Sequence, residues 1–160
     1  MDEDREHRAV RLLKEAYDLQ MKGQLDAAVK LYKESIENYP TAEAYTFLGW
    51  TYSFMGRLDD AIAECYMAIE VDPTFGNPYN DIGAYLLQKG EADAAIPWLL
   101  KALQAPRYAS YHFAHMNLGR AYEMKRDWLR AKCEYEKALA IEREYRPAAQ
   151  ALARIRGLLN

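Results

Sequence analysis

The stretch Tyr45–Pro73, which reads YTFLGWTYSFMGRLDDAIAECYMAIEVDP, decides the fold. In it a Leu-Gly pair, Leu48 and Gly49, is followed three residues later by an aromatic residue, Tyr52. The same arrangement returns along the chain as Ile82-Gly83-x-x-Leu86, Leu118-Gly119-x-x-Tyr122 and, eroded, Glu15-Ala16-x-x-Leu19. The glycine or alanine positions are 33, 34 and 36 residues apart. A period near 34 residues predicts a stacked array of repeats, which usually offers a surface to partners and seldom builds a catalytic centre.

Each repeat is expected to contain two amphipathic helices joined by a short turn. The turns are Lys22-Gly23, Met55-Gly56, Lys89-Gly90 and Lys125-Arg126. Three of them supply the glycine that best tolerates a left-handed backbone at a helix end. In the second helices a small residue precedes a larger one by four places, as in Ala61 and Cys65, which puts both on one helix face. Pro40, Pro73 and Pro106 end the first three repeats, because proline rarely continues a helix.

These residues resemble the tetratricopeptide repeat family. The second repeat matches the family pattern best, through Tyr45, Leu48, Gly49, Tyr52, Gly56, Ala61, Cys65, Ala68 and Pro73. We place the repeats at about 9–41, 42–75, 76–109 and 112–145, and an apolar stripe of Ala148, Leu152, Ile155 and Leu159 predicts a capping helix at about 146–159. The resemblance implies an all-α, right-handed superhelical solenoid of four helix pairs plus that helix, forming a single domain over residues 1–160.

Some positions depart from the family pattern. Repeat four has Arg126 where the turn glycine is usual, and Pro97 falls inside the second helix of repeat three. An insertion, Arg107–Ser110, lengthens the step between repeats three and four. We expect the Ser110 side chain to cap the helix that follows the insertion.

The resemblance also implies where a partner would bind, because the first helices of such repeats line a concave groove. Carried over by position, the aromatic half of the lining is Tyr17, Phe47, Trp50 and Phe54, and the second half is Asn80, Asp81, Phe113, Asn117 and Arg120. Aromatic side chains bury large areas at low entropic cost, and asparagine amides can hydrogen-bond a peptide backbone. We therefore expect a peptide or helix of another protein to bind there. The alternative is that these aromatic residues only pack between the repeats.

One subset of the family grips the C-terminal carboxylate of chaperone tails with lysine, arginine and asparagine side chains. At the corresponding positions this chain has Leu13, Tyr17, Phe47, Asn77 and Asp81. The cations are missing, and one of them is replaced by an acid. Capture of such a tail is therefore not expected.

Charge is distributed unevenly along the chain, whose formal net charge is −3. Residues 1–106 contain 10 Lys and Arg against 18 Asp and Glu, whereas residues 107–160 contain 11 against 6. An acidic front and a basic back favour head-to-tail association, so a self-assembling scaffold and homo-oligomer is the alternative function. Chance variation on solvated helix faces would give the same distribution.

Composition argues against other classes of protein. No apolar run approaches the roughly 20 residues of a membrane span, and the charged N-terminus does not read as a secretory signal. With only two cysteines the expected compartment is the cytoplasm. No nucleophile-base arrangement or phosphate loop stands out, so we expect no enzyme and no cofactor. His112 and His115 have helical spacing but lack a third metal ligand, and a pI near 5.7 makes RNA binding the least favoured alternative.

Overall fold

The computed structural model describes all 160 residues and contains nine helices. The chain has no β-sheet, only an isolated bridge between Phe75 and Arg107. The all-α prediction, with four helix pairs and a final helix, is confirmed. In chain order the helices are α1 (Asp2–Met21), α2 (Leu25–Asn38), α3 (Ala42–Phe54), α4 (Leu58–Val71), α5 (Asn77–Gln88), α6 (Ala92–Gln104), α7 (Tyr111–Met124), α8 (Trp128–Ile141) and α9 (Arg146–Leu159).

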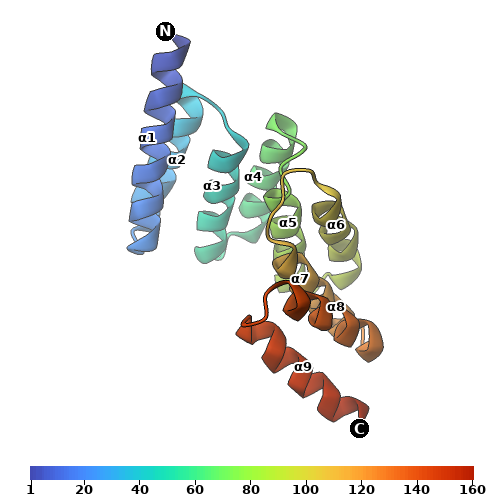
Figure 1. The fold of residues 1–160 in the computed structure, drawn as a ribbon. Coiled ribbons are helices and arrows are strands. Elements are labelled where there is room, and N and C mark those ends of the chain that lie inside the picture. Colours follow the sequence, from blue (N-terminus) through green and yellow to red (C-terminus); the bar gives the residue numbers. More distant parts are fainter.

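The helices stack in chain order into an elongated solenoid, with the two termini at opposite ends (Figure 1). Each helix packs against the next one along the chain. The first helices of the repeats also touch one another, α1 with α3, α3 with α5 and α5 with α7. Through this second set of contacts α1, α3, α5 and α7 form one continuous surface, which is the surface expected to line the groove.

Small residues allow the two helices of a repeat to approach closely. A side chain added at Gly49 would place its Cβ 2.9 Å from the backbone oxygen of Ala61. At Gly83 the added Cβ would lie 2.4 Å from the Leu99 side chain, and at Gly119 it would lie 2.4 Å from the Tyr135 ring. The predicted register of the Leu-Gly motif is confirmed in repeats two to four, because there the glycine faces a large side chain or the backbone of its partner helix.

The turns within the repeats take the left-handed conformation that the sequence predicts. Gly23, Gly56 and Gly90 have φ of 76°, 75° and 80°, and Arg126 has φ of 60° at the equivalent place. Arg126 therefore adopts a backbone that disfavours residues with a side chain.

The capping helix α9 covers the end of the stack. Its Ala151, Leu152 and Ile155 are buried against α8, where they meet Ala131 and Tyr135. The prediction for Leu159 was wrong, since 39% of this side chain is exposed. It lies in the last turn of α9.

The insertion between α6 and α7 turns back onto the loop between α4 and α5. The Gly76 N–H donates to the Arg107 carbonyl at 3.0 Å, and the Arg107 N–H donates to the Thr74 carbonyl at 3.0 Å. The Arg107 guanidinium forms ion pairs with Asp72 and with Glu43 of α3, the latter at 2.7 Å. Arg107 thus joins the insertion to the loop between α4 and α5 and to the start of α3, beside the groove.

The predicted side-chain cap at Ser110 was wrong. Ser110 does stand at the N-cap of α7, but its hydroxyl accepts no capping hydrogen bond. Its backbone carbonyl instead accepts the N–H of Phe113 at 3.0 Å. This leaves the hydroxyl available to the pocket described below.

Candidate functional site

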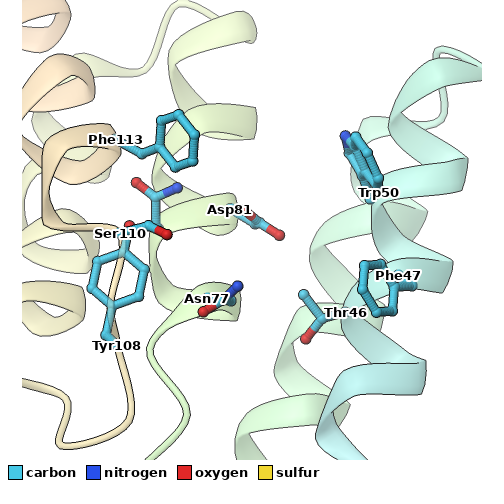
Figure 2. Close-up of a pocket in the computed structure, with 9 residues that line it drawn as sticks. Thr46, Phe47, Trp50, Asn77, Asp81, Tyr108, Ser110 and Phe113 are labelled. Carbon is cyan, nitrogen blue, oxygen red and sulfur yellow. The ribbon is translucent and has the colours of Figure 1, made fainter. Parts of the chain in front are cut away.

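A pocket of about 360 Å³ opens in the groove between α3 on one side and α5 with the start of α7 on the other (Figure 2). Its walls combine aromatic rings with hydroxyl, amide and carboxyl groups. The lining residues are Thr46, Phe47, Trp50, Asn77, Asn80, Asp81, Tyr108, Ser110 and Phe113. The pocket therefore contains five of the predicted groove residues, namely Phe47, Trp50, Asn80, Asp81 and Phe113.

The aromatic residues of the first half form one chain of contacts along the groove. The Phe47 ring lies 5.6 Å from the Tyr17 ring and 6.4 Å from the Trp50 ring, and the Phe54 ring follows at 5.1 Å from Trp50. Phe47 also stacks on Tyr32 at 6.2 Å. Phe47 and Trp50 are half-buried, while Phe54 is 57% exposed. Phe47 thus packs between repeats one and two, while Trp50 and Phe54 extend the ring surface along the groove.

Tyr17 and Phe54 lie outside the main pocket, on either side of its aromatic wall. Tyr17 lines a neighbouring hollow on α1 together with Leu13, Lys14, Asp18 and Phe47. Phe54 extends beyond Trp50 toward the C-terminal end of α3. Both side chains prolong the aromatic surface along the groove.

The two asparagines bind each other. The Asn117 amide on α7 donates to the Asn80 side-chain oxygen on α5 at 3.0 Å, and both residues are 8% exposed. Asn80 still lines the pocket, but Asn117 does not. This hydrogen bond links repeats three and four. Of the two amides that were expected to hold a peptide backbone, only that of Asn80 therefore remains in contact with the pocket.

Asp81 projects from α5 into the pocket, toward Trp50 and Phe47 (Figure 2). Burial raises the pKa of its carboxyl to about 7, although a hydrogen bond from Asn80 works against that rise. Asp81 takes part in none of the ion pairs of the structure, whereas Glu43 and Asp72 nearby are both paired with Arg107. It is the one charged side chain in the lining of the pocket.

Tyr108 and Ser110 are pocket residues that sequence reasoning missed. Tyr108 is 8% exposed, and its ring fills the space beside Gly76, where an added Cβ would lie 2.4 Å from the tyrosine Cβ. The 36-residue step marks the insertion that supplies both residues, but the repeat pattern does not say toward which face an insertion folds. Asn77 and Thr46 complete the polar part of the wall.

Phe113 and Arg120 lie on α7. Phe113 is 42% exposed and packs on His112 and Tyr145 as well as lining the pocket. Arg120 is exposed and is not among the residues that line the pocket. The predicted residues therefore cluster around the pocket, except for Tyr17, Phe54, Asn117 and Arg120.

The His115 and Glu134 side chains, which lie outside the pocket, interact with each other and with Lys137 within the fold. His115 Nδ1 lies 2.7 Å from Glu134 Oε2, and Lys137 binds the other oxygen of Glu134 at 3.0 Å. Burial pushes the pKa of Glu134 up, but the hydrogen bonds from His115 and Lys137 lower it on balance. No group of three or more His, Cys, Asp or Glu side chains is placed to hold a metal ion. None of the nine helices combines the length and the hydrophobicity that a membrane span requires.

Comparison with known proteins supports the repeat assignment. The tetratricopeptide repeat model matches residues 42–75, the second repeat. An inactive TPR repeat-containing thioredoxin of Arabidopsis thaliana, TTL3, is 26% identical over 129 residues, which are 77% of this chain and 19% of that protein. The chain thus spans about a fifth of the length of the curated relatives it matches.

Solved structures show the same fold. Pseudomonas aeruginosa pilF superimposes with a TM-score of 0.88 at 21% identity, covering 95% of this chain and 69% of that one. The first TPR domain of Spaghetti (RPAP3), bound to the HSP90 peptide SRMEEVD, gives a TM-score of 0.69 at 23% identity, covering 74% and 93%. Residues 42–75 thus match the tetratricopeptide repeat family, and the chain as a whole has the stacked helix-pair fold of solved tetratricopeptide repeat proteins.

Proposed function

We propose that the chain is a non-enzymatic adaptor that binds a peptide or helical segment of a partner protein in its concave groove. The observation that carries this proposal is the pocket between α3, α5 and α7, in which the Phe47, Trp50 and Phe113 side chains remain partly exposed. A free surface of this kind offers anchor sites for apolar side chains beside groups that can hydrogen-bond a peptide. The Spaghetti (RPAP3) domain, which shares the fold, is bound to a peptide.

The proposed compartment is the cytoplasm. Cys65 is buried and unpaired, and Cys133 is exposed and unpaired. Unpaired cysteines are typical of proteins in a reducing compartment. Burial also raises the pKa of the Cys65 thiol, so this residue serves as packing rather than as a nucleophile.

The groove is tested by affinity capture from cells of the source organism, read by mass spectrometry. Wild type is compared with Trp50→Ala/Phe113→Ala, which removes two partly exposed rings from the pocket. The control is Tyr66→Ala/Leu129→Ala, which removes two exposed apolar side chains from α4 and α8, outside the pocket. We expect a partner that wild type and control retain and the groove variant loses. Partners retained equally by all three folded proteins would overturn the proposal.

Self-association is a second candidate function, favoured by the position of the charged ends. Asp2, Glu3 and Asp4 open α1, and Arg146 and Arg156 on α9 are exposed at the opposite end of the stack. An acidic end and a basic end at opposite poles suit head-to-tail contacts that salt weakens. Light scattering at low ionic strength checks it: a mass that rises with concentration and falls back on adding salt supports association. A monomer throughout excludes it.

A further inference from the structure

The Asp81 carboxylate is the unusual group in the groove. It is half-buried and takes part in no ion pair, whereas the nearby acids Glu43 and Asp72 are both paired with Arg107. The polar group that bonds Asp81 is the neutral Asn80. A partly desolvated carboxylate without a counter-ion lowers stability, and carboxylates of this kind in clefts are typical of functional sites.

The surroundings of Asp81 suit a cation better than any other ligand charge. No lysine or arginine lines the pocket, and the remaining lining side chains are neutral. Trp50, Phe47 and Phe113 supply aromatic rings around the acid, and ring faces attract cations, tryptophan most strongly. An anionic ligand would meet an unpaired carboxylate and find no compensating charge.

The size of the pocket limits the ligand to about one long side chain. Its volume of about 360 Å³ lies near the lower end of the range for small-ligand sites. The pocket is open to the groove, so a side chain can enter from a segment that lies along α3, α5 and α7. Thr46, Asn77 and Ser110 provide further oxygen atoms at the walls, which can accept hydrogen bonds from the ligand's N–H groups.

We propose that this pocket receives an arginine or lysine side chain of the bound partner segment, with its charged group against Asp81 and its stem between the rings of Trp50 and Phe113. This inference rests on the proposed function, because it specifies the chemistry of the same groove. A pocket of this kind makes the groove prefer basic partner segments and disfavours the binding of acidic ones.

The inference is tested by selecting peptides from a phage-displayed library of random 12-residue sequences on the full-length chain. Parallel selections use wild type, Asp81→Asn and the control Glu70→Gln, which removes the same charge from an exposed residue of α4 that is in no ion pair. The best wild-type peptide is then compared with a version whose basic residue is replaced by methionine. We expect about a tenfold or larger loss of affinity for the methionine peptide on wild type and on Glu70→Gln. On Asp81→Asn the two peptides should bind within about threefold of each other.

A second variant keeps the test independent of Asp81. Trp50→Leu retains apolar bulk but removes the indole face, so it should also reduce the preference for the basic peptide. Peptides that depend on Trp50 but show no enrichment of arginine or lysine would overturn this inference and leave the groove function standing. A preference that persists in Asp81→Asn would overturn it as well. If no selected peptide depends on Trp50 or Phe113, both the inference and the proposed function fail.

Discussion

Gly49 sits where α3 crosses α4, and its lack of a side chain sets the distance between the two helices. An added Cβ would lie 2.9 Å from the Ala61 carbonyl oxygen and 3.5 Å from the Cys65 sulfur. The nearest atom belongs to the backbone, so the strain cannot be relieved by rotating a side chain. We expect Gly49→Ala to lower the free energy of unfolding by about 1–3 kcal/mol, measured by urea denaturation.

Gly157 is the matched control for this substitution. It is also helical, but nothing lies within 4 Å of a Cβ added there. Gly157→Ala should therefore raise stability by roughly 0.5 kcal/mol, because alanine favours the helix over glycine. Equal effects of the two alanines would show that the helix crossing at Gly49 is not as tight as described.

Asp81 gives a prediction about pH. Its pKa is about 7 in the folded chain, compared with about 3.9 in an unfolded one, so the folded state holds the proton more strongly. The contribution of the protonated carboxyl to the free energy of unfolding is therefore fully present below about pH 4 and is lost as the pH rises through about 7. Asp81→Asn should accordingly stabilise the chain at pH 8, on the order of 1–3 kcal/mol, and have little effect at pH 4.

Three buried groups that interact with Asp81 stay neutral in this interval. Burial raises the pKa of Cys65, Tyr85 and Tyr108, which therefore stay neutral between pH 4 and 8. Urea denaturation of wild type and Asp81→Asn at both pH values measures the difference. A stability gain of the same size at pH 4 and pH 8 would contradict a raised pKa at this carboxyl.

At the scale of the elements, the repeat pattern predicts the helix pairs well because it records the packing directly. Gly83 and Leu99 are a motif glycine and a second-helix residue in the sequence, and they are neighbours in the fold. The insertion is different, since its position depends on backbone hydrogen bonds of Arg107 with Thr74 and Gly76 that no periodicity encodes. For the same reason the pocket contributions of Tyr108 and Ser110 were not predictable.

The hydrogen-bond partners of polar side chains could not be predicted from the sequence either. Asn80 and Asn117 were predicted as groove residues from their register on the first helices, and in the structure Asn80 lines the pocket whereas Asn117 does not. Whether the two amides face a ligand or each other depends on how far apart α5 and α7 lie. In the structure these helices are close enough for the Asn117 amide to donate to the Asn80 side-chain oxygen at 3.0 Å.

The capping helix provides an element-scale prediction. Ile155 is fully buried against α8, whereas Leu158 in the same helix is 58% exposed. Ile155→Ala removes buried apolar atoms and leaves a cavity, so it should cost about 2–5 kcal/mol of stability. Leu158→Ala should change stability by less than about 0.5 kcal/mol. Thermal unfolding of both variants checks this, and a similar loss at the two positions would place α9 differently on the stack.

At the scale of the whole molecule, the solenoid has no single core that all repeats share. One cluster of buried residues runs from Ala16 to Ala121 through α1 to α7, while the cluster at α8 and α9 is separate from it. The helices of the first repeat have no extensive contact with α7, α8 or α9. Stability should therefore be distributed along the stack as a sum of neighbour contacts.

This arrangement predicts that damage at one end stays local. In Ile155→Ala, amide hydrogen exchange should become faster in α8 and α9 and, to a smaller degree, in α7, because these helices lose their end cover. Exchange in α1 to α3 should match that of wild type, since these helices keep all their contacts. Leu158→Ala is the control and should leave every helix unchanged. Faster exchange of equal size in all nine helices would instead mean that the stack unfolds as one cooperative unit, and that binding in the groove is coupled to the stability of both ends.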